Sequence, residues 1–304
     1  MDINWLKVLG IIITPIIAFI VGVAYGGIVR NITARVQNRF GPPVVQNFWD
    51  IIKLYSKKTT VSHGWMHHLA PVFAITASVT TLYFIPVLRD SKLFANLSFS
   101  GDLIFLLYIM VFGSLGMALG VGQSGNPNAA IGVSRGLSMM VGYEIPFVLA
   151  LVAIMIQFHT TSLNDLLAVQ DKFTNWIIFQ SPIAFIAAIL AFLGMMGYAP
   201  FDVVIAPAEI ASGPPSEFGG KYLGLMQTSR SIFTFAKLVL FTDIFLGGAG
   251  DFGTLIVKTF LLYMIPVLTG IVNPRFRTEQ AIRFFWKWPT VFGVIAILAV
   301  VMKG

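Results

Sequence analysis

The chain has 304 residues, of which 57% are hydrophobic and 11% are charged, with a net charge of +7. Soluble domains usually carry about 25% charged residues, so an ordinary water-soluble enzyme is excluded. The positive charge is too dilute for a nucleic-acid-binding surface, and no recognition motif accompanies it. Because the chain has no cysteine, disulfides, thiolate-bound iron–sulfur clusters and a cysteine nucleophile are also excluded. We expect an all-α integral membrane protein, with residues 1–304 forming a single membrane domain.

A transmembrane helix needs about 20 mostly apolar residues, and about eight such runs lie between charged or Gly/Pro-rich breaks. The first run continues into basic sequence, which is typical of a retained span and not of a signal peptide. The sixth is interrupted by Lys237 and Asp243. The expected spans are Val8–Val29, Ala70–Leu88, Leu103–Val121, Met139–Phe158, Pro182–Tyr198, Ile232–Leu246, Leu255–Val272 and Trp286–Val301.

The basic residues indicate how these spans are oriented. Most Lys and Arg fall in the loops after the first, third, fifth and seventh spans, while the loops on the other side have no net charge. Cytoplasmic loops carry an excess of Lys and Arg. We therefore expect a multi-pass protein of the cell or inner membrane, with four basic cytoplasmic loops and both termini outside.

The first cytoplasmic loop, residues 30–69, contains apolar residues at helical spacing between Asn47 and Lys58. This pattern predicts an amphipathic helix on the membrane surface, and a lipid-facing anchor is one interpretation of it. Upstream, Arg35 and Arg39 precede a Gly-Pro turn. Their guanidinium groups suit either the carboxylates of a docked soluble protein or lipid phosphates, and charge alone does not separate these.

The third cytoplasmic loop, residues 200–228, is rich in Gly and Pro and carries Asp202, Glu209 and Glu217. These acids oppose the basic bias of their membrane face. One interpretation is a solvated loop whose carboxylates pair with nearby Lys and Arg. The other is a place where protons enter or a surface on which a partner docks.

Ionisable residues inside the spans are a second functional signal, because each costs about 2.5–3.5 kcal/mol at mid-helix. Glu144 lies inside the fourth span, where a carboxyl group suits proton relay. Lys237 and Asp243 are six residues apart, so on a regular helix they point in different directions and need separate partners. Interhelical pairing, or snorkelling of Lys237, is the alternative.

The four histidines are His63, His67, His68 and His159. His63 and His67 have the i, i+4 spacing of metal ligands, but no third ligand accompanies them in the sequence, and Pro71 is expected to break the helix there. We interpret them as polar residues at the membrane interface. No nucleotide-binding loop, nucleophile elbow or internal repeat is present, so no catalytic centre of the chain's own is predicted.

Motifs in all four cytoplasmic loops resemble one family over nearly the whole chain. The family is the heel subunit of respiratory complex I, which adjoins the quinone-reducing arm, together with its counterparts in membrane-bound nickel–iron hydrogenases and related ferredoxin-linked complexes. The matching residues are Arg35, Gln37, Arg39, Gly41-Pro42, Asp50, Lys53 and Lys57-Lys58; Ser134-Arg135-Gly136 and Gly142-Tyr143-Glu144; Pro200-Phe201-Asp202, Glu209, Gly213, Glu217-Phe218 and Gly220; and Pro274-Arg275-Phe276-Arg277 with Trp286-Lys287.

The resemblance implies a subunit that anchors soluble electron-transfer subunits and contacts other membrane subunits, including antiporter-like ones. It implies no cofactor on this chain, with iron–sulfur clusters and, in the hydrogenase-type members, a nickel–iron centre in partner subunits that ferredoxin supplies with electrons. The implied proton path comprises Glu144, Asp202, Glu209, Glu217, Lys237 and Asp243. The implied docking residues are Arg35, Gln37, Arg39, Asp50, Lys53, Arg135, Arg275 and Arg277.

Departures from the quinone-linked pattern narrow this expectation. Ile205 and Pro207 stand where quinone-linked members carry acids, and the stretch from Gly213 to Gly220 is similar to that of hydrogenase-type members. We therefore expect a ferredoxin-linked complex of the hydrogenase or sulfur-reductase type. The alternatives are a quinone-binding subunit of an NADH- or ferredoxin-quinone oxidoreductase and a purely structural anchor. A stand-alone transporter would show two related halves, which the sequence lacks.

Overall fold

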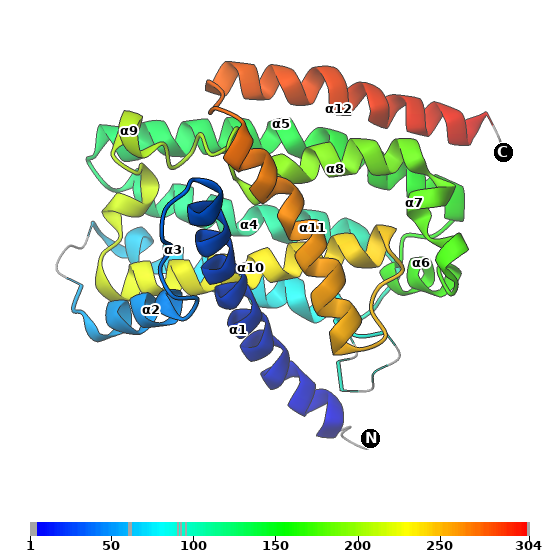
Figure 1. Ribbon diagram of the computed structural model, residues 1–304, viewed down its shortest axis with the longest axis horizontal. Coiled ribbons are helices and arrows are strands. Elements are labelled where there is room, and N and C mark those ends of the chain that lie inside the picture. The colour runs from blue at the N-terminus through cyan, green and yellow to red at the C-terminus, as the bar shows by residue number, and fades with distance from the viewer. Residues whose placement is uncertain (1–4, 60–62, 90, 92, 95, 303–304) are drawn as a thin grey trace. The chain divides into compact units, whose positions relative to one another are not determined.

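The computed structural model describes residues 5–59, 63–89, 91, 93–94 and 96–302, and these form only helices and their connections (Figure 1). The all-α prediction is confirmed. In chain order the elements are α1 (Trp5–Val36), α2 (Gln46–Ser56), α3 (Trp65–Phe84), α4 (Asp102–Gly122), α5 (Pro127–Phe158), α6 (Leu163–Val169), the 3₁₀ helix η1 (Phe173–Asn175), α7 (Ile177–Gln180), α8 (Pro182–Met196), α9 (Pro207–Ile210), the 3₁₀ helix η2 (Pro214–Glu217), α10 (Gly220–Phe245), α11 (Phe252–Val272) and α12 (Thr278–Val301).

All the expected spans correspond to helices, and the chain is a polytopic membrane protein. Among the described residues, five helices are long and apolar enough to cross a membrane: α1 from Leu9, α4, α5, α11 and α12. Helix α8 is apolar but shorter. Helix α3 carries two histidines and α10 carries four Lys, Arg and Asp residues, which explains why neither is among these five.

Several helix ends differ from the sequence prediction. Helix α5 begins at Pro127, twelve residues before the expected start of the fourth span, and α10 begins at Gly220, inside the predicted third loop. Hydropathy reports where lipid begins, whereas a helix continues until its backbone is capped or broken. Pro71 lies within α3, so the expected break there was wrong: a proline in the second turn displaces few backbone hydrogen bonds.

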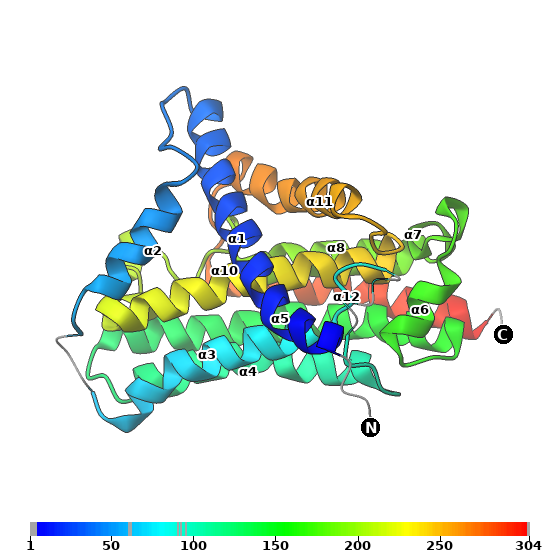
Figure 2. The same ribbon diagram turned by 90° about the horizontal axis from the view of Figure 1, so that it is seen from below.

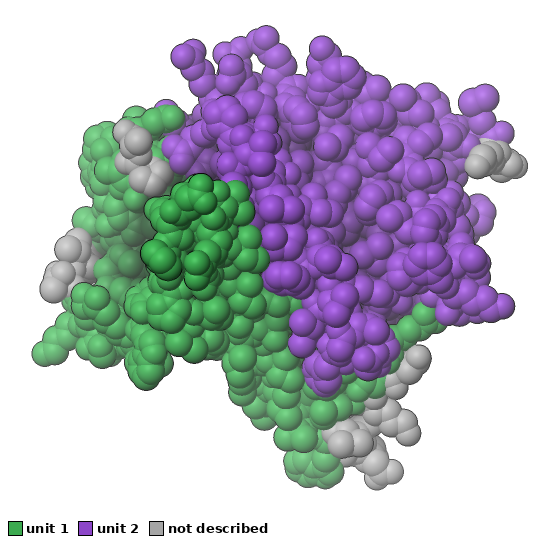
Figure 3. All heavy atoms as spheres, viewed as in Figure 1, with its two compact units in different colours: residues 1–97, 108–134, 204–238 green, residues 98–107, 135–203, 239–304 purple. Residues whose placement is uncertain are grey.

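The chain divides into two compact units, coloured separately in Figure 3. Unit 1 comprises residues 1–97, 108–134 and 204–238, and unit 2 comprises residues 98–107, 135–203 and 239–304. Three of the five divisions fall inside α4, α5 and α10, so each of these helices contributes residues to both units. The two units are described separately below.

In unit 1, α2 packs against α1 (Figure 2). Helix α2 confirms the predicted amphipathic helix, since its apolar and polar residues lie on different faces. Ile51 is buried, while the apolar Trp49 and Ile52 are 62% and 57% exposed. The connection before α2 lies so close to α1 that a Cβ on Gly27 would sit 2.1 Å from the carbonyl oxygen of Val44. Glycine at this position therefore permits a backbone contact that no larger residue allows.

In unit 2, α8 packs against α12 and α11. Four alanines on α8 are buried, namely Ala184, Ala187, Ala188 and Ala191. Small residues let helix backbones approach closely, which is how membrane helices associate without a hydrophobic driving force. Gly194 continues this face, and a Cβ there would meet the Phe285 ring at 2.6 Å. Phe285 belongs to a buried cluster with Met139, Phe201, Val203 and Ala281.

Candidate functional site

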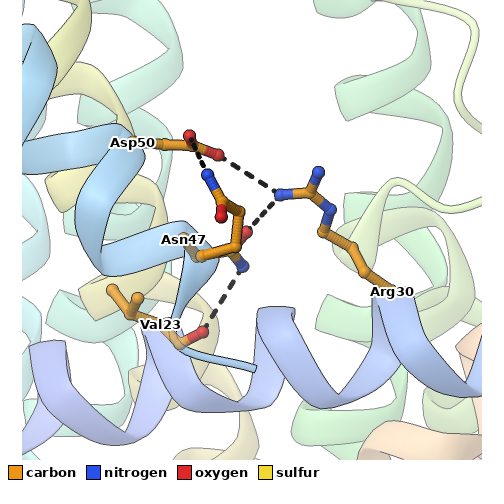
Figure 4. A network of polar contacts seen from close by, with 5 residues as sticks. Val23, Arg30, Asn47 and Asp50 are labelled. Carbon is orange, nitrogen blue, oxygen red and sulfur yellow. Dashed lines mark hydrogen bonds and ion pairs between the residues drawn. The ribbon is translucent and has the colours of Figure 1, made fainter. Parts of the chain in front are cut away.

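A polar network joins the end of α1 to α2 in unit 1 (Figure 4). Arg30 donates to the Asn47 side chain and lies 3.4 Å from the Asp50 carboxylate. Asp50 also accepts from Gln46 at 3.0 Å, and Asn47 donates to the carbonyl of Val23 at 3.5 Å. Asp50, predicted to contact a soluble subunit, is therefore held within the first loop and orients α2.

The predicted docking residues before α2 are exposed. Arg35, Gln37 and Arg39 lie at the end of α1 and just beyond it, and the Arg35 guanidinium stacks over the Phe40 ring at 5.3 Å. The Phe40 side chain is 90% exposed. This end of unit 1 therefore presents basic groups and an aromatic ring together. Lys53 of α2 is also exposed.

In unit 2, Asp202 and Arg275 form a two-point ion pair. The Arg275 Nε and Nη2 atoms each lie 2.6 Å from a different carboxylate oxygen of Asp202. Both side chains are 26% exposed. The sequence placed Asp202 on the proton path and Arg275 on the docking surface, and the structure brings the two together.

Glu217, at the end of η2 in unit 1, has two side-chain partners. One carboxylate oxygen lies 3.2 Å from the His63 Nε2, and the other accepts a hydrogen bond from Asn126. The Glu217 side chain is 11% exposed. The third predicted loop therefore folds its acid onto the beginning of α3, and Glu217 is not a freely solvated carboxylate.

His67, one of the histidines interpreted as polar residues at the membrane interface, is fully buried within the protein. Its ring stacks on Phe218, with centroids 4.7 Å apart and planes 5° apart. Neither ring nitrogen has a hydrogen-bond partner. His67 precedes the apolar run that begins at Ala70. Its pKa is lowered below the ordinary 6.5, mainly because the ring is buried and secondly because His63 lies beside it.

Asp243 is buried at the end of α10 in unit 2, and one of its carboxylate oxygens has no hydrogen-bond partner. The charged group that acts on it is Lys258 of α11, near the start of the expected seventh span. The Lys258 ammonium donates to the carbonyls of Leu246 at 2.7 Å and Gly248 at 2.6 Å, and lies over the Trp176 ring at 4.1 Å.

The remaining predicted site residues fall in both units. In unit 1, Glu209 is exposed on α9 and Lys237 lies over the Phe233 ring at 4.6 Å. In unit 2, Glu144 and Arg135 are half-buried on α5, and Arg277 is exposed just before α12. The part of the chain that the structure describes contains no group of three or more His, Cys, Asp or Glu residues that could hold a metal ion.

Together, the helical fold and these buried ionisable groups are typical of a polytopic membrane protein in which charged side chains inside the helices serve a function. The profile of a family described as NADH dehydrogenase matches residues 7–301, and the chain belongs to this family. It is a membrane subunit of complex I-like respiratory complexes, and therefore part of a multi-subunit membrane assembly. The family resemblance drawn from the loop motifs is thus confirmed.

Named relatives match nearly the whole chain. This chain is 28% identical to a subunit of the NADH-quinone oxidoreductase of Bacillus cereus (strain B4264), over 93% of this chain and 90% of that protein. It is 27% identical to a subunit of the F(420)H(2) dehydrogenase of Methanosarcina mazei, over 88% and 85%. A solved chain of the membrane-bound sulfane sulfur reductase, described as an archaeal respiratory membrane complex, matches with a TM-score of 0.91 and 34% identity, over 97% of this chain and 99% of that one.

Proposed function

We propose that the chain is the membrane-anchoring and coupling subunit of a ferredoxin-linked respiratory complex of the hydrogenase or sulfur-reductase type. In this role it links electron transfer in a soluble arm to proton or sodium translocation. The observation that carries the proposal is the match to a chain of the archaeal sulfane sulfur reductase complex, at 34% identity over nearly the full length of both chains.

The ionisable side chains within the fold support the coupling part of the proposal. Asp243 is 1% exposed and lacks a partner for one oxygen, and Glu144 is half-buried at the centre of the long α5. Charged groups are costly at membrane depth, and those that persist there usually serve ion movement. Glu217, Glu209, Asp202 and Lys237 complete the set that we propose as the ion path.

Basic and amide side chains, several of them exposed, support the docking part. Arg35, Gln37, Arg39 and Lys53 present donors on unit 1, and Arg135, Arg275 and Arg277 belong to unit 2. Planar guanidinium groups bind carboxylates at two points, so we propose that Arg35, Arg39, Arg135 and Arg277 face acidic surfaces of the soluble subunits. Since Arg275 and Asp50 already have partners within the chain, their contribution is to hold the docking loops in shape.

The proposal is tested with the intact complex reconstituted into liposomes. Reduced ferredoxin drives the soluble arm, and ion uptake per electron is measured for the wild type and for Glu144→Gln. The expected result is electron transfer with uptake in the wild type and loss of uptake in Glu144→Gln. The matched control is Glu279→Gln, since Glu279 is a surface carboxylate with 80% of its side chain exposed. Equal uptake per electron in all three complexes would remove Glu144 from the path.

A quinone-linked function is the second candidate, since the Bacillus cereus relative is named as an NADH-quinone oxidoreductase subunit. The same purified complex separates the two functions. Reduction of a short-chain quinone by ferredoxin or NADH supports the quinone-linked role. Electron transfer only to protons or sulfur compounds supports the hydrogenase or sulfur-reductase type.

A further inference from the structure

His67 is an unexpected residue at its position in unit 1. The side chain has no exposure to solvent and no hydrogen-bond partner on either nitrogen, and burying polar atoms without partners costs free energy. Its parallel stacking on Phe218 would be served equally well by an apolar ring. The property that distinguishes imidazole from such a ring is its ability to gain and release a proton near neutral pH.

The groups beside His67 form a graded series from solvent inward. His63 is 27% exposed in its side chain, Glu217 is 11% exposed, and His67 is fully buried. The His63 Nε2 lies 3.2 Å from Glu217, and the His63 and His67 rings meet edge to face with centroids 5.2 Å apart. A titratable pair at the surface therefore adjoins a titratable ring in the interior.

Other titratable groups face the same ring. On α3, His68 lies edge to face with His67, with centroids 6.2 Å apart, and its Nδ1 is hydrogen-bonded to the Tyr222 hydroxyl of α10. The Tyr222 ring lies 5.7 Å from His67. Just beyond α4, Gln123 accepts from the backbone N–H of His67 at 3.4 Å. These contacts fix the first turn of α3 and hold the imidazole in place.

We propose that His67 is the inner proton carrier of an uptake site whose outer members are His63 and Glu217. The inference rests on the proposed function, because it supplies a point at which protons enter the path. A proton from water protonates the His63–Glu217 pair, the N–H bond of the His63 imidazolium breaks, and an N–H bond forms on neutral His67. The His67 imidazolium then loses a proton from its other nitrogen and returns to the neutral ring.

The released proton moves towards the deeper part of the same helix pair. The buried face of α3 continues from His67 through Ala74 to Ser78 and Thr81. There the Ser229 hydroxyl of α10 donates to the Ala74 carbonyl at 2.7 Å and lies 3.4 Å from the Ser78 hydroxyl. These hydroxyl and carbonyl groups lie on the buried face of the same helix pair, and the proposed path passes the proton towards them. The lowered pKa of His67 keeps the ring neutral at rest and ready to accept the next proton.

The test uses His67→Phe in the intact complex, since phenylalanine keeps an aromatic ring against Phe218 and removes only the interaction of the imidazole with the Gly120 backbone. Proton uptake per electron is measured in liposomes, and reduction of a soluble dye by the electron-transfer arm is measured separately. We expect an assembled complex with normal dye reduction and proton uptake that is reduced at least about tenfold. Loss of a proton-transfer group usually slows a reaction by about 100-fold or more, so a tenfold reduction is a conservative threshold. The control is His159→Asn, at a left-handed position with φ of 51° that Asn tolerates.

Wild-type uptake per electron in His67→Phe would overturn the proposal. If that variant does not assemble, His63→Ala decides, because the partly exposed His63 site is reachable by imidazole in the buffer. We expect this variant to lose uptake and to recover it on adding imidazole, and uptake that is unimpaired or not restored counts against the relay. A wild-type complex that moves no ion refutes the proposed function itself. One that moves sodium without protons refutes only the relay.

Discussion

Arg275 holds Asp202 through two parallel contacts of 2.6 Å, one from Nε and one from Nη2. Arg275 lies in the connection between α11 and α12, and Asp202 lies beyond the end of α8. The adjacent backbone strengthens the link, since the Phe276 N–H donates to the Pro200 carbonyl at 2.9 Å. The connection after α8 and the connection between α11 and α12 are therefore held together by these bonds. The Arg275 guanidinium compensates the negative charge of Asp202.

Replacing Arg275 with alanine should destabilise the protein measurably. Hydrogen bonds to charged groups contribute about 1.5–3 kcal/mol when shielded, and the 26% exposure of both side chains reduces this to about 1 kcal/mol. We expect a drop of about 2–4 °C in the unfolding midpoint of the detergent-solubilised complex. The control is Arg283→Ala, whose ion pair with Glu279 is equally short at 2.6 Å but 75% and 80% exposed. Equal falls in the unfolding midpoint for both variants would show that the Arg275–Asp202 pair stabilises the protein no more than an exposed ion pair does.

A second prediction concerns the close contact between α1 and the connection before α2. In Gly27→Ala the new methyl group would lie 2.1 Å from the Val44 carbonyl oxygen, so the connection must move. Overpacking of this kind costs about 1–3 kcal/mol, and the shift would disturb the Arg30–Asp50 network. We expect faster tryptic cleavage at Arg39.

The matched control for that experiment is Gly122→Ala at the end of α4, where an added Cβ has no neighbour within 4 Å. Alanine there favours the helical backbone and creates no clash. Cleavage at Arg39 should therefore stay at the wild-type rate. Slower or unchanged cleavage in Gly27→Ala would contradict the predicted displacement.

A third prediction concerns pH. Burial lowers the pKa of His67 below 6.5, so the unfolded chain binds the proton at a higher pH than the folded protein does. The neutral ring's contribution to stability is thus complete above pH 6.5 and is lost as the pH falls through the lower folded pKa. Unfolding midpoints measured from pH 8 down to pH 5 should fall less steeply in His67→Phe than in the wild type. Identical slopes would mean that His67 is not held neutral by the fold.

The sequence could predict the helices because their signal is local. Apolar runs located the spans, and helical spacing placed the amphipathic helix at Asn47–Lys58, close to the observed Gln46–Ser56. The ends were missed where a helix continues past its apolar run, as α5 does for twelve residues before Met139. Hydropathy carries no information about that extension.

The pairings within the site were less predictable because their partners are far apart in sequence. His63 and Glu217 are far apart along the chain, and neither the Gly/Pro-rich loop nor the i, i+4 histidines indicates the other. Lys258 was not among the predicted site residues, yet it donates to carbonyls just beyond α10 and acts on Asp243. Only the folded structure shows which of the few ionisable residues contact one another.

The last prediction concerns Gln170, a buried side chain that no sequence motif singled out. Its Oε1 accepts from the N–H groups of Ile177 at 3.2 Å and Gly247 at 3.1 Å. Its Nε2 donates to the carbonyls of Asp243 at 3.0 Å and Ile244 at 3.2 Å. One amide thus satisfies the backbone at the end of α10 and at the start of α7.

Gln170→Leu keeps the size of the side chain and leaves these buried backbone groups without partners. Each unsatisfied group costs about 1–3 kcal/mol, so we expect loss of assembled complex or a fall of several degrees in its unfolding midpoint. Gln180→Leu is the control, because that amide makes one hydrogen bond of 2.9 Å, to the Asn175 carbonyl, from a part-buried position. Gln170→Leu complexes as heat-stable as Gln180→Leu complexes would show that water replaces the amide, and that the end of α10 does not depend on Gln170.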